Sequence, residues 1–235
     1  MANLEGRVIE SKQLTGAEQA AMYALMAEFY DDTDPAVFLR DLMEKDYCIL
    51  LYDEAGGLQG FSTQQLMAVE VQGKTVHGVF SGDTIIHKEY WGSLELFRLF
   101  GAYFVELGKT WESFYWFLIS KGYKTYKMLP LFFKEYYPNC QGGTPPFEQA
   151  VMDAFGMAKY PDEYDPSSGL ILYRGTKDKL KPGVADITDK QLKDQTIRYF
   201  LKRNPEHFKG NDLVCLANLT EDNLRPGILR LIQGK

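Results

Sequence analysis

Long apolar runs, cysteine and histidine are all scarce in this chain of 235 residues. No stretch approaches the roughly 18 consecutive apolar residues that a membrane-spanning helix needs. The first residues lack the charged and then apolar pattern of a secretory signal, so we expect a cytoplasmic protein without a membrane span. The three cysteines lie far apart and show no metal-binding spacing. We expect Cys48 and Cys215 to be buried and Cys140 to be exposed in a loop.

Several motifs that identify enzyme classes are also missing. The chain has no Gly-x-Ser-x-Gly elbow, no Gly-x-x-x-x-Gly-Lys loop, no His-Glu-x-x-His pair and no glycine-rich dinucleotide motif. Its histidines, His77, His87 and His207, are scattered. We therefore do not expect a serine hydrolase, a kinase or a metalloenzyme, and we expect no metal. The net charge of −6 argues against nucleic acid as the main partner.

The chain does contain enough apolar material for a large core. Hydrophobic residues make up 45% of it and aromatic residues 14%. We find no internal repeat and no linker that would release an independent part. We therefore expect a single domain over residues 1–235, with a core at about 7–137 and with closing strands, a helical insertion and a C-terminal helix over 138–235.

The first half of the sequence predicts a strand, two helices and three further strands. Residues 7–10 favour a short strand, and Thr15 with Glu18 forms the capping-box pattern that opens a helix. Asp34 followed by Pro35 opens a second helix. An antiparallel meander should follow, with strands at residues 47–52, 58–70 and 75–86.

The chain is organised around residues 79–97, where a strand turns into a helix. The β-branched run Thr84–Ile86 is typical of a strand, and apolar residues recur every three or four positions from Leu94 to Leu107. The period changes at Gly92. A helix that begins there directs free backbone N–H groups at the bend, which suits a phosphate but is equally the geometry of any strand-to-helix turn.

The next strand, at residues 114–119, is apolar on both faces and should be central in a sheet. A strand–helix–strand unit is normally a right-handed crossover, which places residues 113–120 parallel to residues 79–87. We therefore expect an α/β (α+β) fold with a mixed, mostly antiparallel sheet, one parallel pair and helices on both faces.

This order of elements resembles the GNAT superfamily of N-acyltransferases over roughly residues 7–137. In that family the bend after the fourth strand follows the pattern Gln or Arg, two residues, Gly, one residue, then Gly or Ala, and it holds the pyrophosphate of acyl-coenzyme A. The corresponding positions here are Glu89, Gly92 and Leu94, so this chain keeps only the central glycine.

A second family signature, Leu-Tyr-x-Lys-x-Gly-Phe, resembles residues 131–137, Leu-Phe-Phe-Lys-Glu-Tyr-Tyr. Phe132 stands where the family often has a tyrosine that acts as general acid. Tyr126 is a candidate replacement for that acid, although a tyrosine in this setting is more often a packing residue. Pro130 should kink or restart the helix that carries it.

The resemblance implies that the two parallel strands part beside residue 85. In the family a backbone N–H on the first strand stabilises the oxyanion, and Ile85 or Ile86 would supply it here. Free main-chain groups bind the pantetheine arm, and Ser120 would contribute to that wall. The other residues expected to bind the donor are Trp91, Gly92, Ser93, Leu94 and Lys121.

Polar side chains on the first strand are candidates for proton transfer. Ser81, Asp83 and His87 share one face if the strand is regular, and Thr84 then faces the other side. An ionised Asp among apolar residues needs partners or a function, and Ser81 and Thr84 are close enough in sequence to be those partners. His87 is either a proton shuttle or an ordinary surface histidine.

Lysines at positions 121, 124 and 127 form a basic stripe, and a later basic cluster comprises Arg174, Lys177, Lys179 and Lys181. These groups are either solvated surface or a docking site for the phosphates of coenzyme A or for an acidic acyl carrier protein. The changed pyrophosphate pattern favours the carrier protein.

The resemblance fades beyond Pro138. We expect a helix over residues 146–158, an irregular acidic segment at 160–168, and a helix capped by Thr188 that runs to about residue 203. Strands at 170–173 and 213–217 should close the sheet, and residues 220–232 should cover its edge.

We therefore expect an N-acyltransferase in which a primary amine of an amino acid, peptide or small molecule attacks an acyl thioester directly. Aromatic residues between 111 and 137, with Phe147 and Phe155, suit either a pocket for a medium or long acyl chain or an ordinary core. The alternatives are a GNAT-shaped binding module without turnover, which Phe132 and the changed bend permit, and a relative of the acyl-homoserine-lactone synthases.

Overall fold

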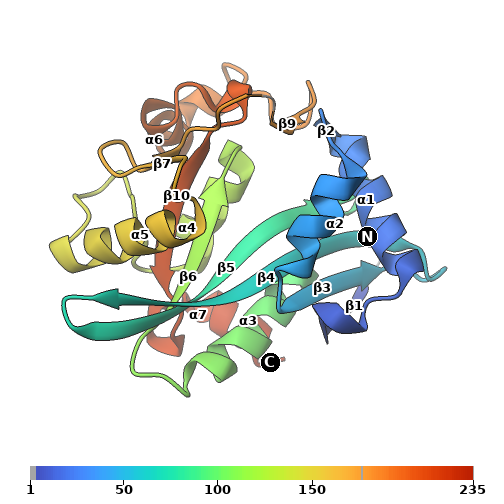
Figure 1. Ribbon diagram of the computed structural model, residues 1–235, viewed down its shortest axis with the longest axis horizontal. Coiled ribbons are helices and arrows are strands. Elements are labelled where there is room, and N and C mark those ends of the chain that lie inside the picture. Colours follow the sequence, from blue (N-terminus) through green and yellow to red (C-terminus); the bar gives the residue numbers. More distant parts are fainter. Residues whose placement is uncertain (1–3, 176, 235) are drawn as a thin grey trace.

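The fold is an eight-stranded mixed sheet with helices on both faces, as predicted (Figure 1). The computed structural model describes residues 4–175 and 177–234. The sheet strands are β1 Glu5–Glu10, β3 Tyr47–Tyr52, β4 Leu58–Val71, β5 Lys74–Ile86, β6 Phe114–Ser120, β7 Tyr164–Asp165, β8 Leu170–Ile171 and β10 Asp212–Asn218. They lie in the order β1-β3-β4-β5-β6-β10-β8-β7, with β5 parallel to β6 and the other neighbours antiparallel. β2 Tyr30–Asp31 and β9 Lys179–Leu180 form a separate pair.

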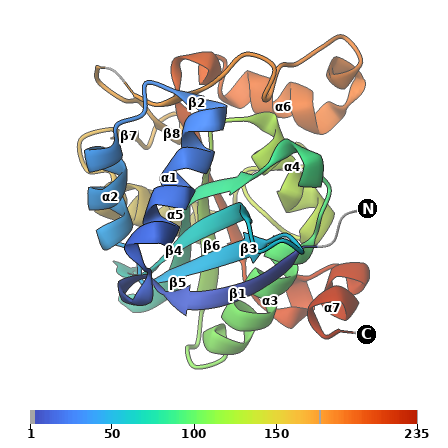
Figure 2. The same cartoon turned by 90° about the vertical axis from the view of Figure 1, so that its right-hand side faces the viewer.

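Seven helices among the described residues pack on the two faces of the sheet (Figure 2). The helices are α1 Gly16–Phe29, α2 Pro35–Met43, α3 Glu95–Gly108, α4 Tyr123–Phe132, α5 Pro146–Lys159, α6 Gln195–Arg203 and α7 Pro226–Ile232. α1, α2 and α5 cover one face, where they bury Phe61 and Phe80. α3, α4 and α6 cover the other, where they bury Val79 and Trp116.

Both N-terminal helices begin where their capping residues predict. The Thr15 side chain accepts the Glu18 backbone N–H at 3.2 Å, while the Glu18 carboxylate accepts the Thr15 N–H at 2.8 Å. Asp34 accepts backbone N–H groups from Ala36 and Val37. These contacts satisfy donors that the first helical turn leaves free, which confirms the predicted starts of α1 and α2.

β6 is the central strand that its apolar sequence predicts. Phe114, Trp116 and Leu118 face the α3 side, whereas Tyr115 and Phe117 face α5. Each of the five is at most 5% exposed. β6 pairs with β5 on one side, as far as Leu118, and with β10 on the other, so both of its faces are covered and it lies inside the sheet.

The C-terminal half closes the sheet but differs from the prediction in detail. β10 lies between β6 and β8, which confirms the expected closing strands. Residues 220–232 do not cover the sheet edge, because α7 packs on α3, with Ile232 against Gly101. The reason is the apolar surface that α3 turns away from the sheet, where Ile228, Leu229 and Ile232 join the core.

Two predicted helix starts are wrong. α6 begins at Gln195, where Asp194 accepts the Thr196 N–H, because the Thr188 side chain instead bonds Gln191 at the start of a separate 3₁₀ turn. α3 begins at Glu95 rather than at Gly92. A 3₁₀ turn over Lys88–Tyr90 precedes it, and Gly92 has a φ of +104° that does not fit a right-handed helix.

Cys48 and Cys215 are buried as expected, and Cys140 is half-buried. Among the described residues, no helix combines the length and apolar character needed to cross a membrane.

Candidate active site

The sheet opens between β5 and β6 (Figure 1). Their parallel pairing runs from His77 with Phe114 to Ser81 with Leu118 and then stops. β5 continues to Ile86 on β4, and β6 continues to Ser120 on β10. Because each strand stays with its outer neighbour, the two inner edges diverge and leave main-chain groups without a strand partner.

A bulge in β5 lies at the point where the strands diverge. Gln64 pairs with Ser81 and Ser62 with Thr84, so two residues of β5 face Thr63 alone. The first of them is Gly82, where a Cβ would lie 2.7 Å from the Thr63 hydroxyl and 2.9 Å from the Lys45 side chain. The close approach requires glycine here, and the extra residue bends the strand away from β6.

The bulge changes which side chains share a face. The Trp116 indole N–H donates to Ser81 Oγ at 2.7 Å, and the Ser81 hydroxyl donates to Gln64 Oε1 at 2.7 Å. The amide of Gln64 donates to Ser62, which is 2.7 Å from the Thr84 hydroxyl. Ser81 and Thr84 therefore lie on one face and Asp83 lies on the other, contrary to the prediction for a regular strand.

The free edge of β5 exposes main-chain groups at alternate residues. The His87 N–H donates to the Gln59 carbonyl oxygen at 2.7 Å, so His87 faces β4. Strand alternation then turns Ile85 toward β4 and turns Thr84 and Ile86 toward the opening. The Ile86 carbonyl oxygen accepts the Trp91 indole N–H at 2.8 Å, so one of these groups is occupied by a side chain.

Asp83 is half-buried and lies beyond the last β5–β6 pair, on the face of the sheet that carries α2 and α5. No side chain within residues 4–175 and 177–234 donates a hydrogen bond to its carboxylate. Burial raises the pKa of Asp83 to about 6, and the charges of Asp41 and Asp178 add to the rise. Lys45 and Lys177 oppose it. The carboxylate is therefore a base whose pKa lies close to neutrality.

The charges of Asp178 and Lys177 act on Asp83, and with three further side chains these residues form a cluster that we call the acidic chamber: Asp83, Lys121, Tyr173, Lys177, Asp178 and Asp212. The Lys121 ammonium lies 3.2 Å from Asp212 and 3.7 Å from Asp178. Tyr173 donates to Asp212 at 3.0 Å. The Lys177 ammonium lies 2.6 Å from Asp178.

The phenol of Tyr30 faces the same chamber from β2. Burial raises the pKa of Tyr30 well above its usual range, and the charges of Asp83, Asp212 and Asp178 raise it further. A pKa in this direction keeps the hydroxyl protonated, so it can donate a hydrogen bond but does not act as an acid near neutral pH.

Residues 177–187, which we call the strap, cross the open end between the strands (Figure 1). β9 within the strap pairs with β2, and the Lys181 N–H donates to the Phe29 carbonyl oxygen at 2.9 Å. On the other side, a Cβ on Gly122 would lie 3.1 Å from Leu180 and 3.3 Å from Ala185. The strap therefore joins the end of α1 to the start of α4 and roofs the acidic chamber.

The bend between β5 and α3 carries four of the predicted donor-binding residues, Trp91 to Leu94. Trp91 is 46% exposed, and the Lys124 ammonium lies 3.3 Å from the centre of its ring. Ser93 Oγ accepts the Glu95 N–H at 3.3 Å. Arg98 holds both oxygens of the Glu95 carboxylate, so the negative charge in the first turn of α3 is balanced.

His87 lies at the bend end of the opening, away from Asp83. His87 is four positions along the chain from Asp83, which is about 13 Å in an extended strand. His87 Nε2 lies 3.7 Å from the Glu28 carboxylate, and its ring contacts Phe29 edge-on. Within the part of the chain that the structure describes, its buried Nδ1 has no hydrogen-bond partner. We therefore assign His87 no role in proton transfer at Asp83.

Two predicted site residues belong to the core instead. Tyr126 is fully buried, and its hydroxyl donates to the Pro138 carbonyl oxygen at 2.7 Å. Burial raises its pKa well above the usual range of a phenol. Ser120 is also fully buried, with Oγ 3.8 Å from Cys215 Sγ. The Tyr126 side chain does not reach the opening between β5 and β6. The wall expected at Ser120 is its main chain, which lies beyond the last β5–β6 pair at Leu118.

Replacing Tyr126 with Phe is expected to cost about 1 kcal/mol of stability. The loss arises because the Pro138 carbonyl oxygen is left without its buried donor. Urea unfolding of the two proteins measures the loss, and a variant as stable as the native protein would contradict this role of Tyr126.

The aromatic residues expected around an acyl pocket pack into the core. Phe132 stacks on Phe97 with ring centres 3.7 Å apart, and Phe117 stacks on Phe155. Phe132 ends α4, and the next residue, Phe133, forms a β-bridge with Leu224.

The basic groups singled out in the sequence do not form a free surface. Lys127 pairs with Asp194 at 2.7 Å, and Lys124 lies on Trp91. In the later cluster, Lys179 pairs with Asp32, and Lys181 donates to the Ala27 carbonyl oxygen. Sequence reasoning missed Tyr30, Tyr173, Asp178 and Asp212 altogether, because no local pattern marks them.

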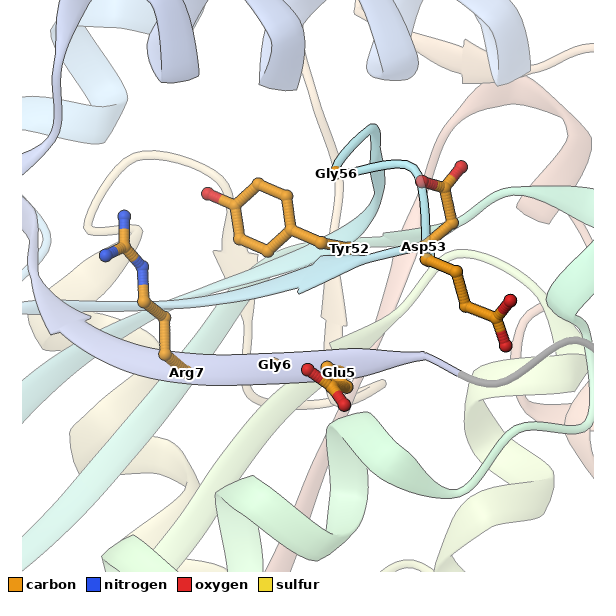
Figure 3. A pocket seen from close by; sticks show the side chains of 7 residues that line it. Glu5, Gly6, Arg7, Tyr52, Asp53 and Gly56 are labelled. Carbon is orange, nitrogen blue, oxygen red and sulfur yellow. The ribbon is translucent and has the colours of Figure 1, made fainter.

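A separate groove of about 560 Å³ lies at the β1 edge of the sheet, three strands away from β5 (Figure 3). Two of its charged groups, Arg7 and Asp53, have partners. Arg7 lies 2.5 Å from Glu18, and the Tyr52 hydroxyl donates to the same carboxylate at 2.9 Å. Asp53 accepts backbone N–H groups of the turn that follows it. We therefore place no chemistry in this groove.

No protein-family model matches the chain, and no curated protein matches it in sequence. Solved structures share part of the fold. A protein of unknown function from Enterococcus faecalis V583, a probable N-acyltransferase, is 15% identical over 56% of this chain and 33% of its own, with a TM-score of 0.42. The GNAT family N-acetyltransferase YhbS from Escherichia coli, solved in complex with CoA, is 15% identical over 52% of this chain and 64% of its own, with a TM-score of 0.38.

An aminoglycoside acetyltransferase from an uncultured soil metagenomic sample, solved in complex with sisomicin, is 11% identical over 53% of this chain and 82% of its own, with a TM-score of 0.38. This chain spans less than two thirds of the length of the E. faecalis and E. coli proteins.

Proposed function

We propose that this protein transfers an acyl group from an acyl thioester to a primary amine by direct attack of the amine. One observation carries the proposal: β5 and β6 stop pairing after Ser81 and Leu118, and Asp83 lies on the part of β5 beyond that point. Diverging strands offer bare main chain to an extended thioester arm, and Asp83 is a base beside it.

Asp83 is the proposed general base. A primary amine reaches the site as an ammonium with a pKa of about 10.4 and must lose a proton before it attacks. The Asp83 carboxylate, with a pKa of about 6, is ionised at neutral pH and takes that proton. It can then pass the proton to the leaving thiolate, whose thiol has a pKa of about 8.5. This route needs no tyrosine at Phe132 or Tyr126.

Main-chain N–H groups are the proposed donors to the oxyanion. Of the two predicted residues, Ile85 faces β4 and Ile86 faces the opening. Thr84 faces the opening as well and is nearer to Asp83. We therefore propose the Thr84 and Ile86 N–H groups as contacts of the thioester carbonyl and the pantetheine arm. Ser81 supports this edge through Gln64 and Trp116 without touching substrate.

The donor that we propose is an acyl-CoA rather than an acyl carrier protein. The structure of YhbS holds CoA. Lys121, Lys127, Lys179 and Lys181, which would attract an acidic carrier, are each engaged by groups of this chain. The bend from Trp91 to Leu94 would then meet the phosphates, with Lys124 as the nearest cation. Donor entry requires the Trp91 indole to leave the Ile86 carbonyl oxygen.

The acceptor that we propose is an amine-bearing small molecule. Asp83, Asp178 and Asp212 give the chamber a negative character that favours an ammonium. The soil acetyltransferase was solved in complex with sisomicin, an amine-bearing small molecule.

A binding module without turnover is the second candidate, and one observation favours it. Trp91 and the strap occupy the opening that a donor would enter, so the chain as it stands covers its own slot. In this case an acyl-CoA would bind only weakly, and no amide would form.

The test is incubation with acetyl-CoA, octanoyl-CoA and palmitoyl-CoA, each with aminoglycosides, diamines and amino acids. Mass spectrometry for new amides and a thiol assay for free CoA are the readouts, and the change in Trp91 fluorescence reports donor binding. We expect thiol release that depends on the amine. Donor binding without thiol release would favour the module. If the donor neither binds nor releases its thiol, the proposal is overturned.

A further inference from the structure

Lys177 projects from the strap into the acidic chamber. Its ammonium lies 2.6 Å from the Asp178 carboxylate and 5.0 Å from the centre of the Tyr173 ring. Its Cβ and Cγ lie 3.8 and 3.9 Å from where a Cβ on Gly210 would stand, so the stem packs against the start of β10. A primary alkylammonium of the chain itself therefore lies beside two members of the acidic chamber, Asp178 and Tyr173.

The other two lysines of the strap point elsewhere, which makes the placement of Lys177 specific. Lys179 is paired at 3.0 Å with Asp32, outside the chamber, and its side chain is 46% exposed. Lys181 donates to the Ala27 carbonyl oxygen at the end of α1. Three lysines within five residues thus have three different surroundings, and only Lys177 among them pairs with Asp178 of the acidic chamber.

Charges on several elements act on the Lys177 ammonium. Burial alone lowers its pKa, but the carboxylate of Asp178 on the strap, Asp83 on β5 and Asp212 on β10 together raise the pKa above its usual value. Lys121 is the cation that faces the same carboxylates. Lys177 in turn lowers the pKa of Asp83, so the two groups interact electrostatically.

We infer that Lys177 is an acceptor within the same molecule, and that the protein acylates this lysine when an acyl thioester occupies the slot. The inference rests on the proposed function, because it uses the same donor and the same base. Lys177 is then a modification site. The acceptor in the chamber is a primary alkylamine at the end of a flexible stem.

The reaction balances without a further reactant. The Lys177 ammonium gives one proton to Asp83, and its nitrogen then attacks the carbonyl carbon of the thioester. A C–N bond forms and the C–S bond breaks, so that the sulfur leaves with the bonding pair and takes the proton from Asp83 as a thiol. The nitrogen releases its second proton to water. The products are an amide on Lys177 and free coenzyme A.

The experiment is incubation of the full chain with acetyl-CoA at pH 8, followed by cleavage with chymotrypsin after Tyr173. Tandem mass spectrometry then separates acetylation at Lys177, Lys179 and Lys181. We expect the occupancy of Lys177 to exceed that of either neighbour by about tenfold or more. Chemical acetylation without catalysis should instead mark the exposed Lys179 first, because its amine is open to solvent.

Variants make the outcome decisive. The change Lys177→Arg should remove the label without raising it at Lys179, and Asp83→Asn should lower Lys177 labelling by about tenfold or more while the folded protein still binds acetyl-CoA. Lys179→Arg is the matched control on the same strap and should leave Lys177 labelling unchanged. Equal labelling of the three lysines, or full labelling in the Asp83 variant, would overturn the inference.

The inference and the proposed function can fail separately. If added amines are acetylated while Lys177 is not, the inference is wrong and the acyltransferase proposal stands. If acetyl-CoA neither binds nor reacts with Lys177 or any added amine, both are wrong.

Discussion

Replacing Asp83 with Asn is expected to lower the rate of the proposed acyl transfer by about 10²- to 10⁴-fold, the usual contribution of a general base. Asn keeps the shape of the side chain but cannot take the proton of the attacking ammonium. In the native protein the rate should rise with pH through about 6 as Asp83 ionises, and that limb of the profile should be missing from the variant. Initial rates from pH 5 to 9 at saturating donor check this.

The same substitution should make the protein more stable at neutral pH. Asp83 has a pKa of 3.8 in the unfolded chain and about 6 when folded, so the folded state binds the proton more tightly. The tighter proton binding by Asp83 adds its full contribution to folding stability below pH 4, and that contribution is lost as the pH rises through 6. At pH 8 the ionised carboxylate therefore costs about 3 kcal/mol, at about 1.4 kcal/mol per pKa unit.

The Asn variant avoids that cost, so its thermal midpoint at pH 8 should rise by roughly 5 to 10 °C for a chain of this size. Near pH 4 the two proteins should have similar midpoints. A variant that is both less active and less stable at pH 8 would show that Asp83 serves packing rather than catalysis. Thermal unfolding scans at pH 4 and pH 8 separate these cases.

Replacing Lys121 with Met should destabilise the protein by about 3 to 5 kcal/mol. Met keeps much of the apolar stem but removes the ammonium that lies 3.2 Å from Asp212, whose side chain is 2% exposed. The aspartate would be left buried with Tyr173 as its remaining described donor. Urea unfolding at pH 7 measures the loss, which should lower the thermal midpoint by roughly 10 °C.

Lys127→Met is the matched control, because it removes a lysine of the same stripe from an ion pair that is 37% and 34% exposed. Exposed pairs contribute less than about 1 kcal/mol, so this variant should unfold almost like the native protein. Similar losses in the two variants would contradict the buried role of Lys121.

The acid sensitivity of the two variants should differ as well. Burial opposes ionisation of Asp178, but the charges of Lys121 and Lys177 hold its pKa below the usual range. A carboxyl group with a lowered pKa stabilises the fold at pH values above its pKa in the unfolded chain. That stabilisation is lost as the pH falls through its pKa in the folded protein. Part of the acid destabilisation of the native protein should therefore disappear in Lys121→Met.

Local patterns in the sequence determined most of the elements and the order in which they meet. The capping box at Thr15, the Asp34-Pro35 pair and the two-faced apolar run of β6 predicted structure correctly because hydrogen bonds and burial within a few residues decide such features. The parallel pairing of β5 with β6 followed from the handedness of a strand–helix–strand crossover.

Only the tertiary structure decided what surrounds Asp83. The bulge at Gly82 reversed the predicted facing of Ser81, Asp83 and Thr84, because one extra residue shifts every later side chain to the other face. Tyr30, Lys121, Lys177 and Asp212 meet there although long stretches of chain separate them. Charges that look like a solvated stripe in the sequence become a buried network once distant segments close over them, since Coulombic interactions depend on separation in space and on exclusion of water.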